Sequence, residues 1–248
     1  MANQVFLTVN DDQEYVIDAK NCETNYFIRL QNAVANIKYD ITNAIVNILF
    51  INDFNEQITI NDQGKIDNQS EVEVMFIDLI NHDYLQSSSI DVCHGSSLSV
   101  ITKFLTFKKR QIKMLYRNID PQTNIKIDNS CVSLDQSDLQ FECIGKIVNG
   151  AKFSKNMQAS RCLTIDYPKQ SLIEPVLLID ENEVEAAHAL SSGTIDPDVL
   201  YYLNSRGISY KEAMNLIIHS YLLPQVEQLA IFTNGEELLE ELSRKVVF

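Results

Sequence analysis

The chain has 248 residues and carries 34 Asp and Glu against 20 Lys and Arg, a formal net charge of −14 at pH 7. An acidic balance of this size opposes nonspecific binding to phosphate backbones, so we expect no nucleic-acid partner. No run of roughly 18 apolar residues is present, and no basic segment precedes an apolar one at the N-terminus. We therefore expect a soluble, cytoplasmic protein with neither a membrane span nor a signal peptide.

The cysteines form no C-x-x-C pair and no spacing typical of a zinc site. Five are present, at positions 22, 93, 131, 143 and 162. An odd number in a cytoplasmic chain favours reduced thiols, which behave as small buried hydrophobic side chains.

From Val5 to about Ile179 the chain is a series of short alternating runs, such as EVEVMFIDL at 71–79 and LQFEC at 139–143. An apolar residue at every second position predicts a half-buried β-strand. About fifteen such strands without intervening helices leave three architectures, a β-sandwich, a closed barrel or a parallel β-solenoid.

The segments between these runs are rich in Asn, Asp, Ser and Gln and poor in Gly and Pro. Tight hairpins prefer Asn-Gly, Asp-Gly or Gly-Gly, of which only one Asn-Gly, at 149–150, occurs in this region. This favours the solenoid over the sandwich without excluding the latter. The one basic cluster, 106–117, is interpreted as a solvated strand edge whose charges discourage pairing with other chains.

A first helix is predicted after Gly193. Asp196 is placed to cap its N-terminus, Pro197 suits the first helical position, and Gly207 suits the residue just beyond the C-terminus.

A second helix is predicted directly afterwards, because Ser209 and Glu212 have the spacing of a capping box. Pro224 is expected to kink or end it. A third helix is expected from about Asn234, with acidic residues in its first turns and Arg and Lys in its last. The chain is thus predicted to consist of a β body, residues 1–190, and a C-terminal helical subdomain, residues 191–248.

The segment 174–229 resembles the C-terminal signature of the SufB/SufD family, the scaffold proteins of an iron–sulfur cluster assembly system. Eleven positions in order over 26 residues match it: His188, Ala189, Gly193, Tyr202, Leu203, Ser205, Arg206, Gly207, Ile208, Glu212 and Ala213. A second segment, GKIVNGAKFSKNMQASRCLTID at 145–166, is similar to an upstream motif of the family. The resemblance covers roughly residues 115–245.

This resemblance implies a right-handed parallel β-helix followed by helices that dock an ABC-type ATPase called SufC. It also implies that the β-helix pairs with a second SufB- or SufD-like subunit, in a homo- or heterodimer. Family members are commonly longer and begin with a helical region, which we expect to be absent here because strands begin almost at Val5.

The resemblance makes His188 the first candidate ligand of a transient iron–sulfur cluster shared with a partner, and Cys162 a second, weaker candidate metal ligand. Ala159, Ala186 and Ala189 stand where relatives carry a cysteine, a cysteine and a glutamate, so the chain is SufD-like in what it lacks.

The predicted partner-binding residues lie on the first two helices: Tyr202, Arg206, Gly207, Leu216 and Leu222. No nucleophile elbow and no Gly-rich phosphate loop is present, so we predict no catalytic residue and no enzymatic activity. The predicted function is an assembly scaffold. The alternative is a degenerate relative that binds a partner without holding a cluster.

Overall fold

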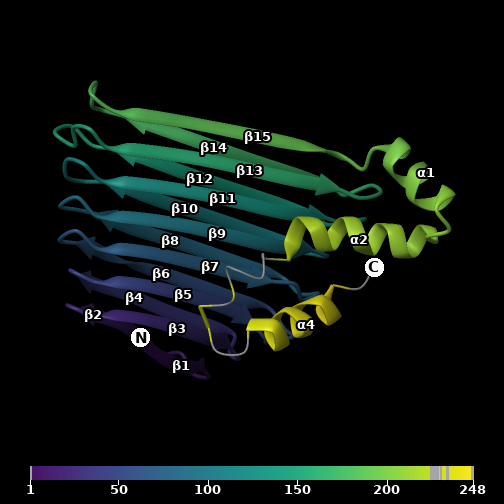
Figure 1. The fold of residues 1–248 in the computed structure, drawn as a ribbon, viewed down its shortest axis with the longest axis horizontal. Helices are drawn as coiled ribbons and strands as arrows, with labels where there is room; N and C mark the ends of the chain where they lie inside the picture. The colour runs from purple at the N-terminus through teal and green to yellow at the C-terminus, as the bar shows by residue number, and fades with distance from the viewer. Residues whose placement is uncertain (1, 224–228, 230, 233–234, 247–248) are drawn as a thin grey trace.

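A computed structural model describes residues 2–223, 229, 231–232 and 235–246. In this part of the chain the sequence forms fifteen strands and then three helices (Figure 1). The strands are β1 Asn3–Val9, β2 Glu14–Lys20, β3 Glu23–Leu30, β4 Val34–Thr42, β5 Ile45–Asn52, β6 Ile58–Asp67, β7 Glu71–Asp78, β8 Tyr84–Val92, β9 Ser97–Thr106, β10 Lys109–Asn118, β11 Asn124–Ser133, β12 Asp138–Ile147, β13 Lys155–Thr164, β14 Gln170–Ile179 and β15 Glu185–Thr194. The helices are α1 Pro197–Ser205, α2 Tyr210–Leu222 and α4 Gly235–Lys245.

The strands form two parallel sheets that share no strand. Odd-numbered strands make an eight-stranded sheet in the order β1-β3-β5-β7-β9-β11-β13-β15, and even-numbered strands make a seven-stranded sheet in the order β14-β12-β10-β8-β6-β4-β2. Each turn of the chain therefore adds one strand to each sheet. This is a parallel β-solenoid, so the architecture that the resemblance implied is confirmed.

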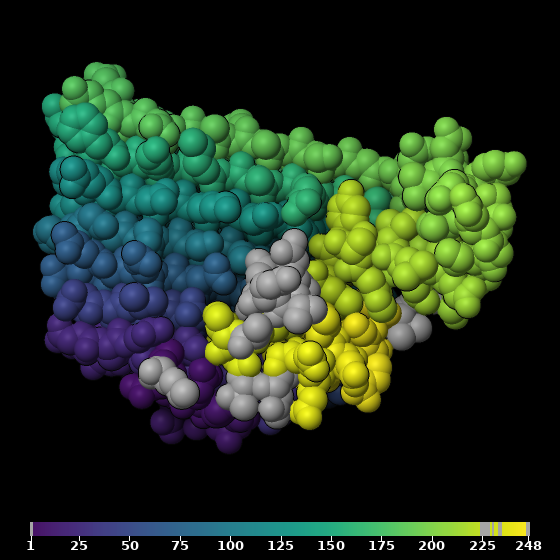
Figure 2. All heavy atoms as spheres, viewed as in Figure 1, coloured from purple at the N-terminus to yellow at the C-terminus, as the bar shows by residue number. Residues whose placement is uncertain are grey.

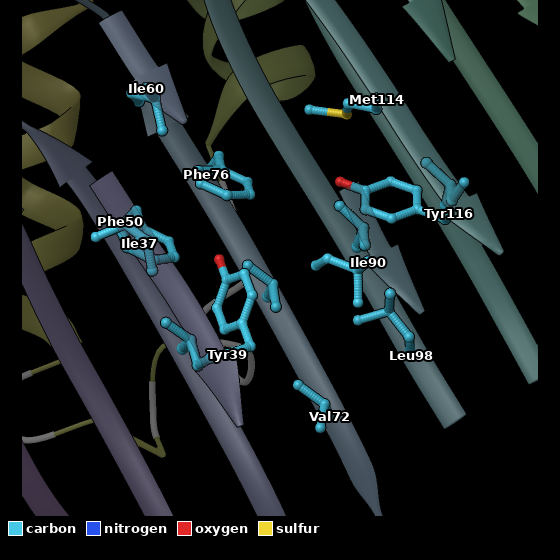
Figure 3. Packing of buried hydrophobic residues seen from close by; sticks show 14 of the residues in the cluster. Ile37, Tyr39, Phe50, Ile60, Val72, Phe76, Ile90, Leu98, Met114 and Tyr116 are labelled. Atoms are coloured by element: carbon cyan, nitrogen blue, oxygen red, sulfur yellow. The ribbon is translucent and has the colours of Figure 1, made fainter. Parts of the chain in front are cut away.

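The lumen between the two sheets is filled by the inward-facing residues of successive turns. Burial alternates along strands such as β12, which shows that every second side chain points inward. Figure 3 shows this packing for residues of β4 to β10, where the Phe50 and Phe76 rings stack with centroids 4.7 Å apart. Because neighbouring turns place similar side chains in register, identical rings can stack along the axis.

The corners of the solenoid are turned by polar residues in the left-handed region. Among the described residues, nine other than glycine have positive φ, and seven of these are Asn, Gln or Asp. Asparagine side chains also link corners, since Asn43 Nδ2 donates to Asn21 Oδ1 at 2.8 Å. This agrees with the polar turns read from the sequence, although no serine adopts the conformation among the described residues.

The basic cluster at 106–117 does not lie at a sheet edge, which corrects the sequence interpretation. It forms β10, which lies between β8 and β12 in the middle of its sheet. Arg110 points inward, is 1 % exposed, and donates to Asp78 Oδ2 at 3.2 Å between the rings of Tyr84 and Phe104. Alternation along one strand places its neighbours Lys109 and Lys113 in solvent.

Helices α2 and α4 cover the outer face of the eight-stranded sheet (Figures 1 and 2). Their buried apolar residues pack on outward-facing residues of β5 to β13, including Leu49 and Val132. Helix α4 is also held by charge, because Arg29 of β3 binds Glu241 at 2.7 Å. The hydrogen bond from Arg29 lowers the pKa of Glu241 to about 2.

Candidate functional site at the final turn

The last turn of the solenoid is open. β14 and β15 each pair with one neighbour, β12 and β13 respectively, and no described strand lies on their other side. Every residue of β15 is exposed. Figure 1 shows this strand along one margin of the molecule, with no other element above it. The structure therefore ends in two unpaired strand edges around the open end of the lumen.

The edge of β15 lacks the features that normally prevent strands from pairing between molecules. Its ten residues, EAAHALSSGT, contain no Lys and no Pro, and small side chains make up most of the strand. At about 3.3 Å per residue the edge is about 33 Å long. An exposed, regular edge of this length is a template for another strand. By contrast, Pro175 interrupts the β14 edge, since a proline offers no N–H.

His188 lies on the inner face of β15, at the open end of the lumen. It is in register with Gln158 of β13, which points inward and is 4 % exposed. His188 itself is exposed, because no further turn covers it. Its ring makes no hydrogen bond or ion pair with the described residues, so both ring nitrogens are available to a ligand from outside.

Cys162 is separated from His188 and lies inside the lumen. It is in register with Cys131 on one side and Ser192 on the other, and both thiols are 2 % exposed. The neighbouring Cys162 thiol, together with burial, raises the pKa of Cys131. Four positions along the strand separate the register partner of Cys162 from His188, about 13 Å, so the two residues do not share one coordination sphere.

Among the described residues, no group of three or more His, Cys, Asp or Glu side chains could hold a metal ion. His188 therefore supplies at most one ligand from this chain. The predicted burial of the cysteines is confirmed for four of the five, and Cys22 is half-buried.

The first two helices form a second surface. Asp196 accepts from the backbone N–H of Asp198 at 2.9 Å, and Ser209 and Glu212 make the predicted capping box. Gly207 has φ +85, the left-handed conformation that ends a helix and that glycine adopts without strain. The Arg206 guanidinium lies 5.2 Å from the centre of the Tyr202 ring. Local caps thus set the angle between α1 and α2.

Apolar side chains are exposed on this pair of helices. Tyr202 is 56 % and Leu216 is 53 % exposed. Three further residues, not singled out in the sequence, are exposed alongside them: Val199, Tyr201 and Tyr210. Beside Leu216 lies a surface hollow of about 520 Å³ lined also by Gly207 and His219. The adjacent tyrosines Tyr201 and Tyr202 in α1 are the sequence feature that could have identified this exposed surface.

The structure corrects the prediction that Leu222 is a partner-binding residue. Leu222 is fully buried, together with Met214 and Ile218 on the same face of α2, against the outer face of the eight-stranded sheet. Residues four apart lie on one face of a helix, whereas Leu216 lies on the other. Leu222 therefore stabilises the protein itself and offers no surface to a partner. Pro224, expected to end α2, lies outside the described residues.

The fold and the final turn define a class of protein, a parallel β-solenoid that presents an open strand edge and a helical appendage. None of the described helices combines the length and the apolar character that crossing a bilayer requires. A family model described as "SUF system FeS cluster assembly, SufBD core domain" matches residues 3–221. The chain belongs to this SufBD family, which takes part in iron–sulfur cluster assembly.

Several curated relatives match parts of the chain. The iron–sulfur cluster assembly protein SufD of Bacillus subtilis (strain 168) is 42 % identical over 115 residues, covering 46 % of this chain and 26 % of the relative. A SufBD family protein of Pyrococcus horikoshii is 31 % identical over 87 residues, covering 35 % and 20 %. One from Mycobacterium tuberculosis (strain H37Rv) is 25 % identical over 117 residues, covering 47 % and 14 %. The matches thus span about a quarter or less of each relative's length.

Proposed function

We propose that this chain is a non-enzymatic scaffold subunit of an iron–sulfur cluster assembly complex. In this proposal the β14–β15 end pairs with a second SufB- or SufD-like subunit, and α1 and α2 dock an ABC-type ATPase. His188 then supplies one ligand to a cluster that the partner completes. The observation that carries the proposal is the open final turn, with an imidazole on the inner face of an unpaired strand.

Pairing through this end is supported by what the edge leaves unsatisfied. On the side of β15 away from β13, backbone N–H and C=O groups can bond only to water or to another strand. Leu190 of β15 and Leu178 and Ile179 of β14 expose apolar surface at the same end of the solenoid. A second copy or a paralogue would satisfy the backbone groups and bury these side chains together.

The pairing is tested by Leu190→Lys, which places a charge on the inner face of the edge strand. Val16→Lys is the matched control, because Val16 is 51 % exposed on β2, in the turn at the other end of the solenoid. Light scattering after gel filtration, alone and with a tagged SufB-like partner, should show association weakened roughly tenfold or more for Leu190→Lys, because an unpaired lysine would be buried. Equal association of both variants would remove the proposed interface.

Docking of an ATPase is supported by the exposed apolar surface of α1 and α2. Tyr201, Tyr202 and Leu216 are each more than half exposed, and Leu216 lines a surface hollow. Tyrosine is among the residues enriched in binding hot spots. The rigid caps at Asp196 and Ser209 hold the two helices in one arrangement, which lowers the entropy cost of binding.

This docking is tested by the double variant Tyr202→Ala and Leu216→Ala in co-purification with a SufC-type ATPase. We expect the ATPase to be lost while the circular dichroism spectrum stays that of the wild type, because neither side chain is buried. Retention of the ATPase by this variant would contradict the docking assignment. Phe153→Ala is the control, since Phe153 is 63 % exposed at the corner before β13, whereas the helices follow the opposite ends of the odd-numbered strands (Figure 1).

Cluster holding separates the proposal from its alternative, a relative that binds partners without touching iron. Anaerobic reconstitution with Fe²⁺ and sulfide in the presence of the partner subunit should give visible absorption that His188→Ala diminishes. An absorption spectrum that His188→Ala leaves unchanged would favour the alternative, in which the chain only stabilises the complex.

A further inference from the structure

The inner row of the eight-stranded sheet that ends in His188 is apolar over most of its length. In register order it comprises Val5, Tyr26, Ile48, Val74, Val100, Ile127, Gln158 and His188. Only the last two positions carry side chains with nitrogen. A buried amide in a row otherwise filled by valine, isoleucine and tyrosine loses hydration, so a specific interaction is needed to offset that loss.

The orientation of the Gln158 amide is fixed by its surroundings. Its Nε2 donates to the backbone carbonyl of Val176 at 3.2 Å, and a carbonyl can only accept, so the other amide atom is the oxygen. That oxygen, Oε1, is buried and accepts no hydrogen bond from the described residues. Gln158 thus presents an unused acceptor inside the lumen, one strand away from His188.

Gly145 of β12 provides the room for this amide. A Cβ at this position would lie 2.5 Å from Gln158 Nε2 and 2.3 Å from Asn156 Oδ1, too close for either contact. The absence of a side chain at 145 is therefore matched to the polar side chains at 156 and 158.

We propose that Gln158 is a positioning residue for His188, an inference that rests on the proposed function. The two side chains are not hydrogen-bonded in the structure; in solution, rotation of the exposed His188 ring brings its Nδ1–H to the unused Oε1, and this hydrogen bond fixes one tautomer and orients the ring. Nε2 then keeps its lone pair and points out of the open end, toward the iron of a cluster shared with the partner.

The reach and the chemistry support this assignment. Side chains in register on neighbouring strands start about 4.8 Å apart, and both of these point to the inner face. The neighbours of His188 on that face, Ala186 and Leu190, have no polar side-chain atoms that could accept its N–H instead. Nδ1 is the ring nitrogen nearer the backbone, so its use leaves the more distant Nε2 for a ligand.

The test is the tautomer of His188, measured by ¹⁵N–¹H correlation NMR on the labelled chain without iron, at a pH where the ring is neutral. His188→Ala identifies the signals. We expect the Nδ1–H tautomer in the wild type, and a mixture rich in Nε2–H, as in free histidine, in Gln158→Met. Gln158→Glu, which keeps an acceptor, should retain the Nδ1–H tautomer.

The other three histidines report whether each variant is folded, since the ring of His82 is 1 % exposed and hydrogen-bonded to Asp78 at 3.1 Å. Gln86→Met is the matched control, because Gln86 is equally buried in the lumen beside other strands and should leave the His188 signals unchanged. A wild-type mixture of tautomers, or a His188 spectrum that Gln158→Met leaves unchanged, would overturn the proposal.

Iron binding is measured separately, so that the two proposals can fail independently. With the partner subunit present, Gln158→Met should weaken Fe²⁺ binding about 10- to 100-fold, the usual effect of removing a group that orients a metal-binding histidine. If the tautomer changes as expected but His188→Ala has no effect on iron binding, the positioning holds and the cluster-holding function fails.

Discussion

The buried carboxyl group of Asp62 gives the sharpest test of the energetics of the lumen. Asp62 lies on β6, where its Oδ1 accepts from Ser88 Oγ at 2.5 Å and from Gln86 Nε2 at 3.2 Å. Its Oδ2 is buried without a hydrogen-bond partner among the described residues. Burial raises the pKa of Asp62 from 3.8 to about 6, although hydrogen bonds from Ser88 and Gln86 oppose the rise.

A raised pKa means that the folded protein holds a proton on Asp62 at pH values where the unfolded chain has released it. The folded state is therefore favoured at low pH and loses stability as the pH rises from about 4 to about 6. The pKa of Asp62 thus differs by about two pH units between the unfolded and the folded state, which corresponds to about 3 kcal/mol in the free energy of unfolding. Above pH 6 the ionised carboxylate destabilises the fold by this order of magnitude.

Asp62→Asn removes the charge and keeps the shape and the acceptor atom. Its new N–H₂ group takes the place of Oδ2, close to the Tyr39 hydroxyl. We expect Asp62→Asn to be more stable than the wild type by up to about 3 kcal/mol at pH 8, and nearly equal to it at pH 4.

Urea unfolding followed by far-ultraviolet circular dichroism between pH 4 and pH 8 measures this difference, since the sequence contains no tryptophan for fluorescence. Asp40→Asn, at a half-exposed aspartate paired with Lys20, is the control for the loss of a surface carboxylate. An unfolding midpoint for Asp62→Asn that tracks the wild type at every pH, or that is lower at pH 8, would refute the reasoning.

Three further outcomes follow from the packing. Leu222→Ala should lower the free energy of unfolding by about 2–5 kcal/mol, whereas Leu216→Ala should change it by less than about 0.5 kcal/mol. Thermal unfolding measures both, and equal effects would contradict the assigned faces of α2. Glu241→Gln should cost roughly 1 kcal/mol near pH 7, discounted for its partial exposure, and the difference should fade as the pH drops from 4.5 toward 2; a constant difference in urea titrations would argue against the ion pair. Gly145→Ala should destabilise by about 1–3 kcal/mol by crowding Asn156, and an unchanged unfolding midpoint would show that the amides move freely.

Much of the local structure could be read from the sequence. The alternation of apolar residues gave the strands, and the caps at Asp196, Ser209 and Gly207 gave the start of α1, the start of α2 and the turn between them. These signals are local, because a strand or a cap is decided by residues within a few positions. The alternation could not distinguish a solenoid from a sandwich, because strands in both have the same period of two. The family resemblance provided the evidence for the solenoid.

Residues that owe their role to distant neighbours could not be assigned in this way. Arg110 belongs to a basic run that reads as solvated, yet stacking of turns places it opposite Asp78 in the lumen. Leu216 and Leu222 are equally apolar in the sequence, and only the packing of α2 on the sheet shows which of them faces solvent.

The sequence by itself determined the repeated strands, the helical appendage and the presence of an imidazole in the segment that resembles the SufB/SufD signature. Only the tertiary structure decided that His188 follows Gln158 on one inner row, at an end that no further strand covers. The physical reason is register. In this parallel solenoid, residues between about 20 and 30 positions apart become neighbours, and the corner segments that set this offset vary in length from turn to turn.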